Sequence, residues 1–306
     1  GPIGVTGSDS ANAIAEKADV VLAVGTRLQD FTTGSWTAFS PDAKFVGLNV
    51  GRHDAAKHLS LTVVGDAKQS LPALQSAAKG FQCSVSWTDF AKAERATWND
   101  YVDTNTRPGN RPNSYAQAIG VVNTLCHADD RVVAAAGGLP AEVTANWKTL
   151  SIGSVDVEFG FSCMGYEISG AWGARIAQSQ MGKDQNTITF CGDGSYMMMN
   201  SDLYSSVLTE EKIICLVLDN GGFAVINKLQ NNVGQDSFNN LIADTPTATH
   251  QVSVDFEAHA RAMGALAETV ENATELAEAF KRAQAADRSY VIVMQVDPNE
   301  IGRAHV

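Results

Sequence analysis

Two apolar runs in the second half of the chain each end in a short polar segment rich in glycine. The first run covers residues 187–190 and leads into CGDGS at 191–195; the second covers residues 213–218 and leads into DNGGF at 219–223. Strands that are apolar at every position are typical of parallel sheets buried on both faces. The carboxyl ends of parallel strands meet at one edge of a sheet, so the two polar segments are expected to lie together.

One side chain in each polar segment has the oxygen ligands that a hard cation prefers. These are the Asp193 carboxylate and the Asn220 carboxamide, 27 positions apart, with room for a helix between the strands. Glycine lets backbone come close to a bound anion, and the N–H groups of Gly194 and Ser195 are the expected donors. A helix over 201–208 is expected directly after the glycine segment.

The MMM run at 197–199 has two interpretations, a cofactor-binding segment or part of the core. Three consecutive side chains cannot share one face of a helix. Methionine also adapts to irregular gaps in a core. We therefore expect these three residues to fill the core.

Alternating strands and helices predict an α/β protein with two doubly wound parallel-sheet units. We expect residues 1–75 to be part of a central Rossmann-like domain, 76–112 a linker, and 113–306 the second unit. A parallel sheet with no strand before residue 20 indicates a chain that begins inside a domain. Strands are expected at 20–24, 44–50, 61–64, 131–135, 187–191, 213–218 and 290–295. Helices are expected at 11–17, 87–101, 114–125, 170–179, 201–208, 256–263 and 273–286.

Composition excludes several classes of function. The chain has 306 residues and a formal net charge of −12, so a nucleic-acid partner is not expected. No apolar run approaches the roughly 20 residues of a membrane span, and the first residues have no signal-peptide pattern. Five dispersed cysteines favour the reducing cytoplasm. The six histidines form no cluster with metal-ligand spacing.

The Gly-Asp-Gly…Asn pattern in this strand context resembles the signature of thiamine-diphosphate (ThDP) enzymes, in the acetolactate synthase-like family. The resemblance covers essentially the whole chain and implies that residues 113–306 are the domain that binds the ThDP diphosphate. It also implies that Mg²⁺ ties this diphosphate to the protein. Asp193, Asn220 and the carbonyl of Gly222 would be metal ligands, and Asn220 and Gly222 would also border the cofactor.

The same resemblance assigns further residues to the cofactor. Gly192 would lie at the diphosphate with Gly194 and Ser195. Gly138 and Leu139 would form a second diphosphate loop; many relatives have Gly-Gln-His there, whereas GLP at 138–140 leaves only backbone contacts. In the segment 158–166, Met164 would be the apolar wedge that bends ThDP into a V, and the carbonyl of Ser162 would accept a hydrogen bond from its 4′-amino group.

Strings at 4–12, 24–35, 165–170, 192–206 and 219–223 are similar to a branch of the family that acts in myo-inositol catabolism. This likeness implies hydrolysis of a carbon–carbon bond in a cyclic polyol-dione, with 3D-(3,5/4)-trihydroxycyclohexane-1,2-dione opened to 5-deoxy-glucuronate. Two alternatives stay open: an acetolactate synthase-like lyase or ligase of 2-oxo acids, and a non-enzymatic binding module. A NAD-dependent dehydrogenase is disfavoured, because no Gly-x-Gly-x-x-Gly follows the strand at 20–24.

The resemblance also implies what this chain lacks. The glutamate that activates ThDP lies in an N-terminal pyrimidine domain in this family, so we assign no catalytic residue here; Glu158 is an imperfect substitute. We expect a fragment with little activity alone, and an intact protein that is a homo-oligomer, since the family's sites form between subunits. Asp219 is expected to hold its loop or the metal's outer shell. Residues 224–232 are expected to be a helix or mobile flap, with Lys228 and Gln230 at the substrate or in solvent.

Overall fold

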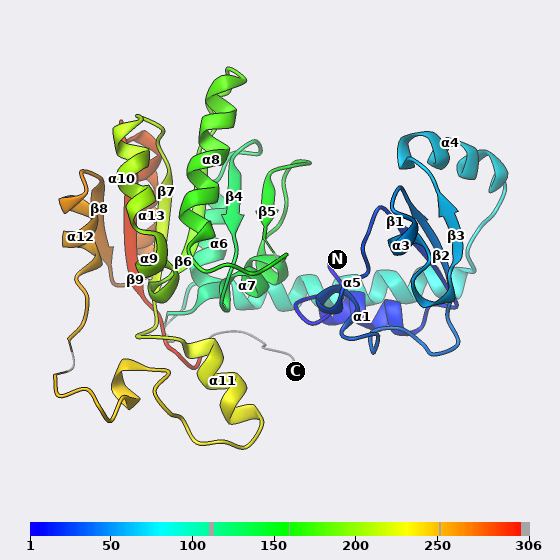
Figure 1. Ribbon diagram of the computed structural model, residues 1–306, viewed down its shortest axis with the longest axis horizontal. Helices are drawn as coiled ribbons and strands as arrows, with labels where there is room; N and C mark the ends of the chain where they lie inside the picture. Colours follow the sequence, from blue (N-terminus) through cyan, green and yellow to red (C-terminus); the bar gives the residue numbers. More distant parts are fainter. Residues whose placement is uncertain (110–112, 159, 251, 301–306) are drawn as a thin grey trace. The chain divides into compact units, whose positions relative to one another are not determined.

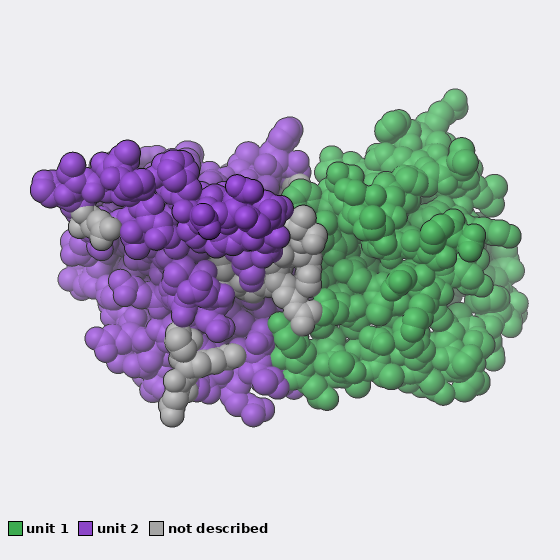
Figure 2. All heavy atoms as spheres, turned by 90° about the horizontal axis from the view of Figure 1, so that it is seen from below, with its two compact units in different colours: residues 1–102 green, residues 103–306 purple. Residues whose placement is uncertain are grey.

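A computed structural model describes residues 1–109, 113–158, 160–250 and 252–300. These residues form two compact units, Gly1–Val102 and Asp103–Val306, which are coloured separately in Figure 2. Residues 110–112 of the predicted linker and Phe159 of the predicted cofactor segment lie outside the described residues. Both units contain a parallel sheet, so the predicted α/β class is confirmed.

Unit 1 is built on three parallel strands in the order β1-β2-β3. They are β1 (Val20–Val24), β2 (Lys44–Asn49) and β3 (Leu61–Val64). A small apolar core includes Phe39, Leu48 and Ala55. The helical segments of this part of the chain are α1 (Asp9–Glu16), α2 (Asp30–Thr33), α3 (Arg52–Ala55), η1 (Lys57–Leu59), α4 (Ala67–Ala77) and α5 (Val85–Asn105).

Unit 2 is built on six parallel strands in the order β5-β4-β6-β7-β9-β8 (Figure 1). The strands predicted at 131–135, 187–191, 213–218 and 290–295 are present, but two more were missed. Those two, β5 and β8, lie at the edges and are only partly buried, so they do not form fully apolar runs. The strands are β4 (Arg131–Ala134), β5 (Val155–Val157), β6 (Thr187–Gly192), β7 (Ile214–Asp219), β8 (Leu266–Val270) and β9 (Tyr290–Gln295).

Helices cover both faces of the six-stranded sheet, as a doubly wound fold requires. One apolar cluster joins the sheet to α6 (Tyr115–Leu125), α7 (Leu139–Asn146) and α13 (Ala273–Ala285). The opposite cluster joins it to α8 (Tyr166–Gln180), α9 (Asp193–Met199), α10 (Ser201–Leu208) and α12 (Phe256–Ala262). Apart from these, α11 (Ala224–Asn232, yellow) and η2 (Ile242–Asp244) lie below the sheet in Figure 1.

The chain reverses its direction of travel across this sheet between β4 and β6. From β4 it passes outward to β5, then returns to the other side of β4 to form β6 and β7. Such a switch point opens a crevice outside the carboxyl ends of the strands, where ligands bind in open α/β sheets. The topology therefore directs attention to the loops after β4, β6 and β7.

The local predictions around this crevice have mixed outcomes. The helix predicted at 201–208 is confirmed as α10, but a further helix, α9, begins at Asp193 with Gly192 as its N-cap and was not predicted. The prediction for the methionine run is wrong. The three methionines of α9 do not fill the core: Met197, Met198 and Met199 are 48%, 56% and 37% exposed. Since α9 is a short helix at the end of the strands, it buries only Asp193, Ser195 and Tyr196.

None of the helices in the described part of the chain is long and apolar enough to cross a membrane.

Candidate functional site

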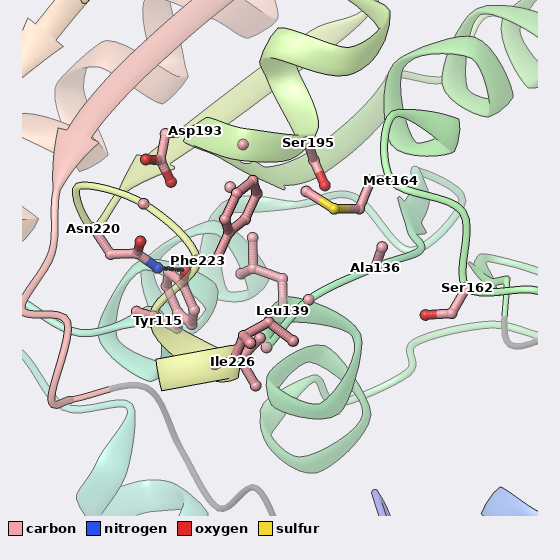
Figure 3. Close-up of a pocket in the computed structure, with 17 residues that line it drawn as sticks. Tyr115, Ala136, Leu139, Ser162, Met164, Asp193, Ser195, Asn220, Phe223 and Ile226 are labelled. Carbon is pink, nitrogen blue, oxygen red and sulfur yellow. Dashed lines mark hydrogen bonds between the residues drawn. The ribbon is translucent and has the colours of Figure 1, made fainter. Parts of the chain in front are cut away.

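A cavity of about 240 Å³ lies at the switch point (Figure 3). Its walls come from the loops after β4, β6 and β7 and from the segment before α8. The structure brings together here all ten residues predicted for the cofactor or the metal. They are Gly138, Leu139, Ser162, Met164, Gly192, Asp193, Gly194, Ser195, Asn220 and Gly222. The cavity is also lined by residues that were not predicted individually as site residues: Tyr115, Ala136, Gly137, Phe223, Ala224, Val225 and Ile226.

Three helices begin at this cavity. They are α7 at Leu139, α9 at Asp193 and α11 at Ala224, each preceded by a residue with no side-chain cap bond. The first N–H groups of a helix have no partner within the helix, and the helix dipole adds positive potential there. The cavity therefore suits an anion such as a diphosphate held by backbone groups.

Asp193 and Asn220 each present a buried side-chain oxygen at the carboxyl ends of β6 and β7. Gly192 of β6 pairs with Leu218 of β7, so the two residues leave neighbouring strands at the same level. Each has a buried Oδ1 atom with no hydrogen-bond partner. Figure 3 shows the Asn220 oxygen directed toward Asp193. Unpartnered buried oxygens are costly, and a divalent cation would satisfy both, so these residues fit Mg²⁺.

The raised pKa of Asp193 also favours a bound cation at this position. Burial raises the pKa of this carboxyl to about 7, the negative charge of Asp219 adds to the rise, and the N–H groups of Gly194 and Gly222 oppose it. A bound cation would remove this penalty by favouring the ionised form. Among the described residues, no group of three His, Cys, Asp or Glu side chains could hold a metal. The proposed ligand set contains an amide and a backbone carbonyl in place of two such side chains.

Tyr115, at the start of α6, was missed by the sequence analysis. Its phenol oxygen accepts a hydrogen bond of 2.5 Å from the Asn220 side-chain nitrogen, which is 105 positions away. The capping-box pattern at 114–117 marks the start of this helix. That pattern gives no sign of what the tyrosine contacts.

Glu167, in the first turn of α8, is a second residue that was missed. Its side chain is fully buried. One carboxylate oxygen accepts the N–H of Ala136 at 3.0 Å and the other accepts the N–H of Gly165 at 2.8 Å. Burial raises the pKa of Glu167, and the bond from Ala136 opposes the rise. The carboxylate thus ties the loop after β4 to the segment that contains Met164.

Two glycines are required by close contacts at the cavity. A Cβ atom on Gly194 would lie 2.7 Å from the Phe223 ring and 3.2 Å from the Met164 methyl group. Gly222 has a φ of 145°, and a Cβ there would lie 2.4 Å from the Asn240 carbonyl oxygen. In Figure 3 the Phe223 ring lies between Met164 and the Asp193/Asn220 pair. The apolar wall of the cavity is therefore packed directly on its glycine backbone.

The segment before α8 is held by its own polar groups. Glu158 accepts the N–H groups of Phe161 and Cys163, and the bond from Phe161 is the main reason that its pKa is lowered. The hydroxyl of Ser162 donates to the Ala135 carbonyl. Glu158 therefore stabilises this loop and does not line the cavity.

The predictions for the loop after β7 have mixed outcomes. Asp219 accepts the N–H of Gly221 at 2.9 Å, so the hypothesis that it holds the loop is confirmed. Residues 224–232 form helix α11, as one alternative proposed. Gln230 exchanges hydrogen bonds with the 236–240 loop. Neither Gln230 nor Lys228 is among the residues that line the cavity.

Comparison with known protein families agrees with this geometry. Residues 135–294 match the C-terminal TPP-binding domain of thiamine pyrophosphate enzymes, and residues 1–74 match the central domain of the same enzymes. The chain belongs to the thiamine pyrophosphate enzymes. Thiamine pyrophosphate is ThDP, so the cavity at the switch point lies in the cofactor-binding domain of this family.

Several relatives of this thiamine pyrophosphate enzyme have the same name. A 3D-(3,5/4)-trihydroxycyclohexane-1,2-dione hydrolase 2 of Bacillus cereus is 32% identical, over 97% of this chain and 50% of the relative. The hydrolases with this name from Bacillus velezensis and Listeria monocytogenes are 33% and 32% identical, over 97% and 100% of this chain and 50% and 51% of theirs. The chain spans about half the length of the curated relatives it matches.

Proposed function

We propose that this chain supplies the diphosphate- and metal-binding half of a ThDP- and Mg²⁺-dependent active site. The observation that carries the proposal is the pair of buried, unpartnered oxygens on Asp193 and Asn220. They lie beside three helix N-termini in the cofactor domain of a ThDP family. In this proposal the carbonyl of Gly222 is the third protein ligand, and phosphate oxygens and water complete the six ligands that Mg²⁺ prefers.

When bound, ThDP supplies a nucleophilic carbon and an electron sink for breaking a bond next to a carbonyl. The residues of this chain bind and orient it. Backbone N–H groups of Gly194, Ser195 and Leu139 would hold the diphosphate, and the side chain of Met164, which also lines the cavity, would pack against the cofactor. Phe223 and Ile226 line the cavity with exposed apolar surface that a bound cofactor would cover. We assign no proton transfer to a residue of this chain.

We further propose that the substrate is 3D-(3,5/4)-trihydroxycyclohexane-1,2-dione, a cyclic polyol-dione, opened by hydrolysis to 5-deoxy-glucuronate in cytoplasmic inositol catabolism. The names of the relatives support the substrate. The activating glutamate would come from a pyrimidine domain outside residues 1–306, within a homo-oligomer. Exposed apolar side chains near the cavity support such a covering domain, among them Phe161 and the methionines of α9.

Calorimetric titration of ThDP tests the binding half of the proposal. We expect binding in Mg²⁺ and a large loss of affinity in EDTA or in the Asp193→Ala variant. Asp202→Ala is the matched control, because this carboxylate bonds to Ser169 away from the cavity. If Asp193→Ala leaves Mg²⁺-dependent binding unchanged, the site assignment is wrong.

Substrate assays on the protein joined to its pyrimidine domain test the chemistry. We expect consumption of the cyclic dione without release of carbon dioxide. Pyruvate consumption with carbon dioxide release would support an acetolactate synthase-like reaction in its place. ThDP binding with neither activity would support a binding module.

A further inference from the structure

A carboxamide is an ambiguous metal ligand, because its two ends are nearly the same in shape and opposite in polarity. Asn220 can present Oδ1 to a cation, or, after a half-turn of the amide group, the two N–H bonds of Nδ2. Only the first orientation binds metal. Asp193 presents an oxygen in either orientation, since both ends of a carboxylate are oxygens.

In the structure the nitrogen of Asn220 has a partner and the oxygen does not. Nδ2 donates to the phenol oxygen of Tyr115 at 2.5 Å, whereas Oδ1 is buried without a partner. Figure 3 shows the nitrogen directed toward Tyr115 and the oxygen toward Asp193. One hydrogen bond therefore selects the orientation in which the oxygen faces the proposed metal position.

The side chain of Tyr115 is itself fixed by burial and by its neighbours. It is only 3% exposed and begins α6 directly after the capping box of Ser114 and Gln117. Its ring packs beside Gly138, where a Cβ atom would lie 3.4 Å from the ring. The tyrosine therefore connects the start of α6, the loop after β4 and the loop after β7.

We infer that Tyr115 is a positioning residue for the metal: its phenol oxygen fixes the Asn220 amide with Oδ1 toward the cation. The inference rests on the proposed function, since it presumes that Asn220 is a metal ligand. Residues that orient metal ligands typically change metal affinity about 10–100-fold when they are replaced.

A double-mutant cycle separates positioning from simple packing. Tyr115→Phe keeps the ring beside Gly138 and removes the acceptor for Asn220. We expect the variant to bind Mn²⁺ in the presence of ThDP about 10-fold more weakly than the parent. In an Asn220→Asp background the same Tyr115→Phe change is expected to weaken binding by less than about twofold, because a carboxylate has an oxygen at both ends. Equal losses in the two backgrounds would overturn the inference.

A measurement without metal keeps the test independent of the proposed function. The side-chain amide protons of Asn220, assigned by nuclear magnetic resonance through their loss in Asn220→Asp, should exchange slowly with solvent in the parent. Tyr115→Phe should speed this exchange clearly, and an unchanged exchange rate would overturn the inference. A parent that shows slow exchange but binds no Mn²⁺ would contradict the proposed function, and with it the metal role of Tyr115.

Discussion

The two sheets of this protein are made of similar strands but are buried to very different extents. In unit 2, β6 and β7 each bury five successive residues. In unit 1, all four residues of β3 are exposed, and so are Val20 and Leu22 of β1. Both sheets are parallel, and a parallel sheet normally has both faces covered.

The difference shows what an apolar strand pattern means. In unit 2, helices of this chain form an apolar cluster on each face of the sheet. In unit 1, large apolar side chains such as Leu61 and Val63 remain exposed within the described residues. An apolar strand pattern therefore predicts that the faces of the strand are buried by other parts of a protein, but it does not predict which parts bury them.

The two units also differ in the charges that they bury. Unit 2 buries the carboxylates of Asp130, Glu142, Glu167 and Asp193. The buried polar residues found in the described part of unit 1 are uncharged: Ser8, Ser10 and Thr33. Buried charge is costly unless it is compensated. Asp193 lines the cavity, and Glu167 accepts the N–H of Ala136, which also lines it, so two of the four buried carboxylates agree with a functional site there.

The largest expected effect comes from matched truncations in the two sheets. Leu216→Ala on β7 removes a side chain that is 0% exposed, and should lower the free energy of unfolding by about 2–5 kcal/mol. Leu61→Ala on β3 removes one that is 69% exposed, and should change it by less than about 0.5 kcal/mol. Hydrogen exchange of peptides from each strand, read by mass spectrometry in urea, measures both. A similar loss in the free energy of unfolding at the two positions would contradict the difference in burial between the two sheets.

A smaller effect is expected for Glu167→Gln, and it should depend on pH. Glutamine places an N–H group against one of the two backbone donors, so at low pH the variant should be less stable by about 1–3 kcal/mol. The pKa of Glu167 is raised in the folded state, so its stabilisation is complete below the ordinary value and is lost as pH rises through the folded pKa. The advantage of the parent over Glu167→Gln should therefore shrink from pH 4.5 upward.

Glu268 is the control for this dependence of stability on pH. Burial acts to raise its pKa, but the bonds from Arg282 and Tyr290 outweigh burial and lower it. The advantage of the parent over Glu268→Gln should accordingly grow as pH rises through the lowered pKa. Urea unfolding across the acid range measures both variants. If the stability advantage of the parent changes with pH in the same direction for Glu167→Gln and Glu268→Gln, the direction of the pKa shift does not distinguish Glu167 from a carboxylate away from the cavity.

The smallest expected effect is at the exposed methionines. Met198→Gln should change the free energy of unfolding by less than about 0.5 kcal/mol, because this side chain is mostly in solvent. A core position would lose several times more. Thermal or urea unfolding of the variant checks the value. A loss above about 2 kcal/mol would restore the prediction that this run fills the core.

Much of the site could be predicted because its residues follow strands that are easily recognised. Asp193 and Asn220 lie in the polar segments that follow two buried strands, and parallel strands bring such positions to one edge. Edge strands such as β8 were missed because half-buried strands lack that pattern. The exposure of Met198 could not be predicted, since it depends on how α9 packs: of its apolar side chains only Tyr196 joins the cluster on the sheet, and the methionines face away from it.

The sequence by itself determined the strands other than β5 and β8, the parallel class of the sheets, and which polar segments lie at the carboxyl ends. These properties follow from local periodicity and from residue chemistry over a few positions. Only the tertiary structure decided that Tyr115 orients Asn220 and that Glu167 joins Ala136 to Gly165. The Tyr115–Asn220 and Glu167–Ala136 contacts join residues from separate elements, and nothing in the local pattern around either partner specifies the other. They depend on how the helices pack on the sheet, which the whole core decides together.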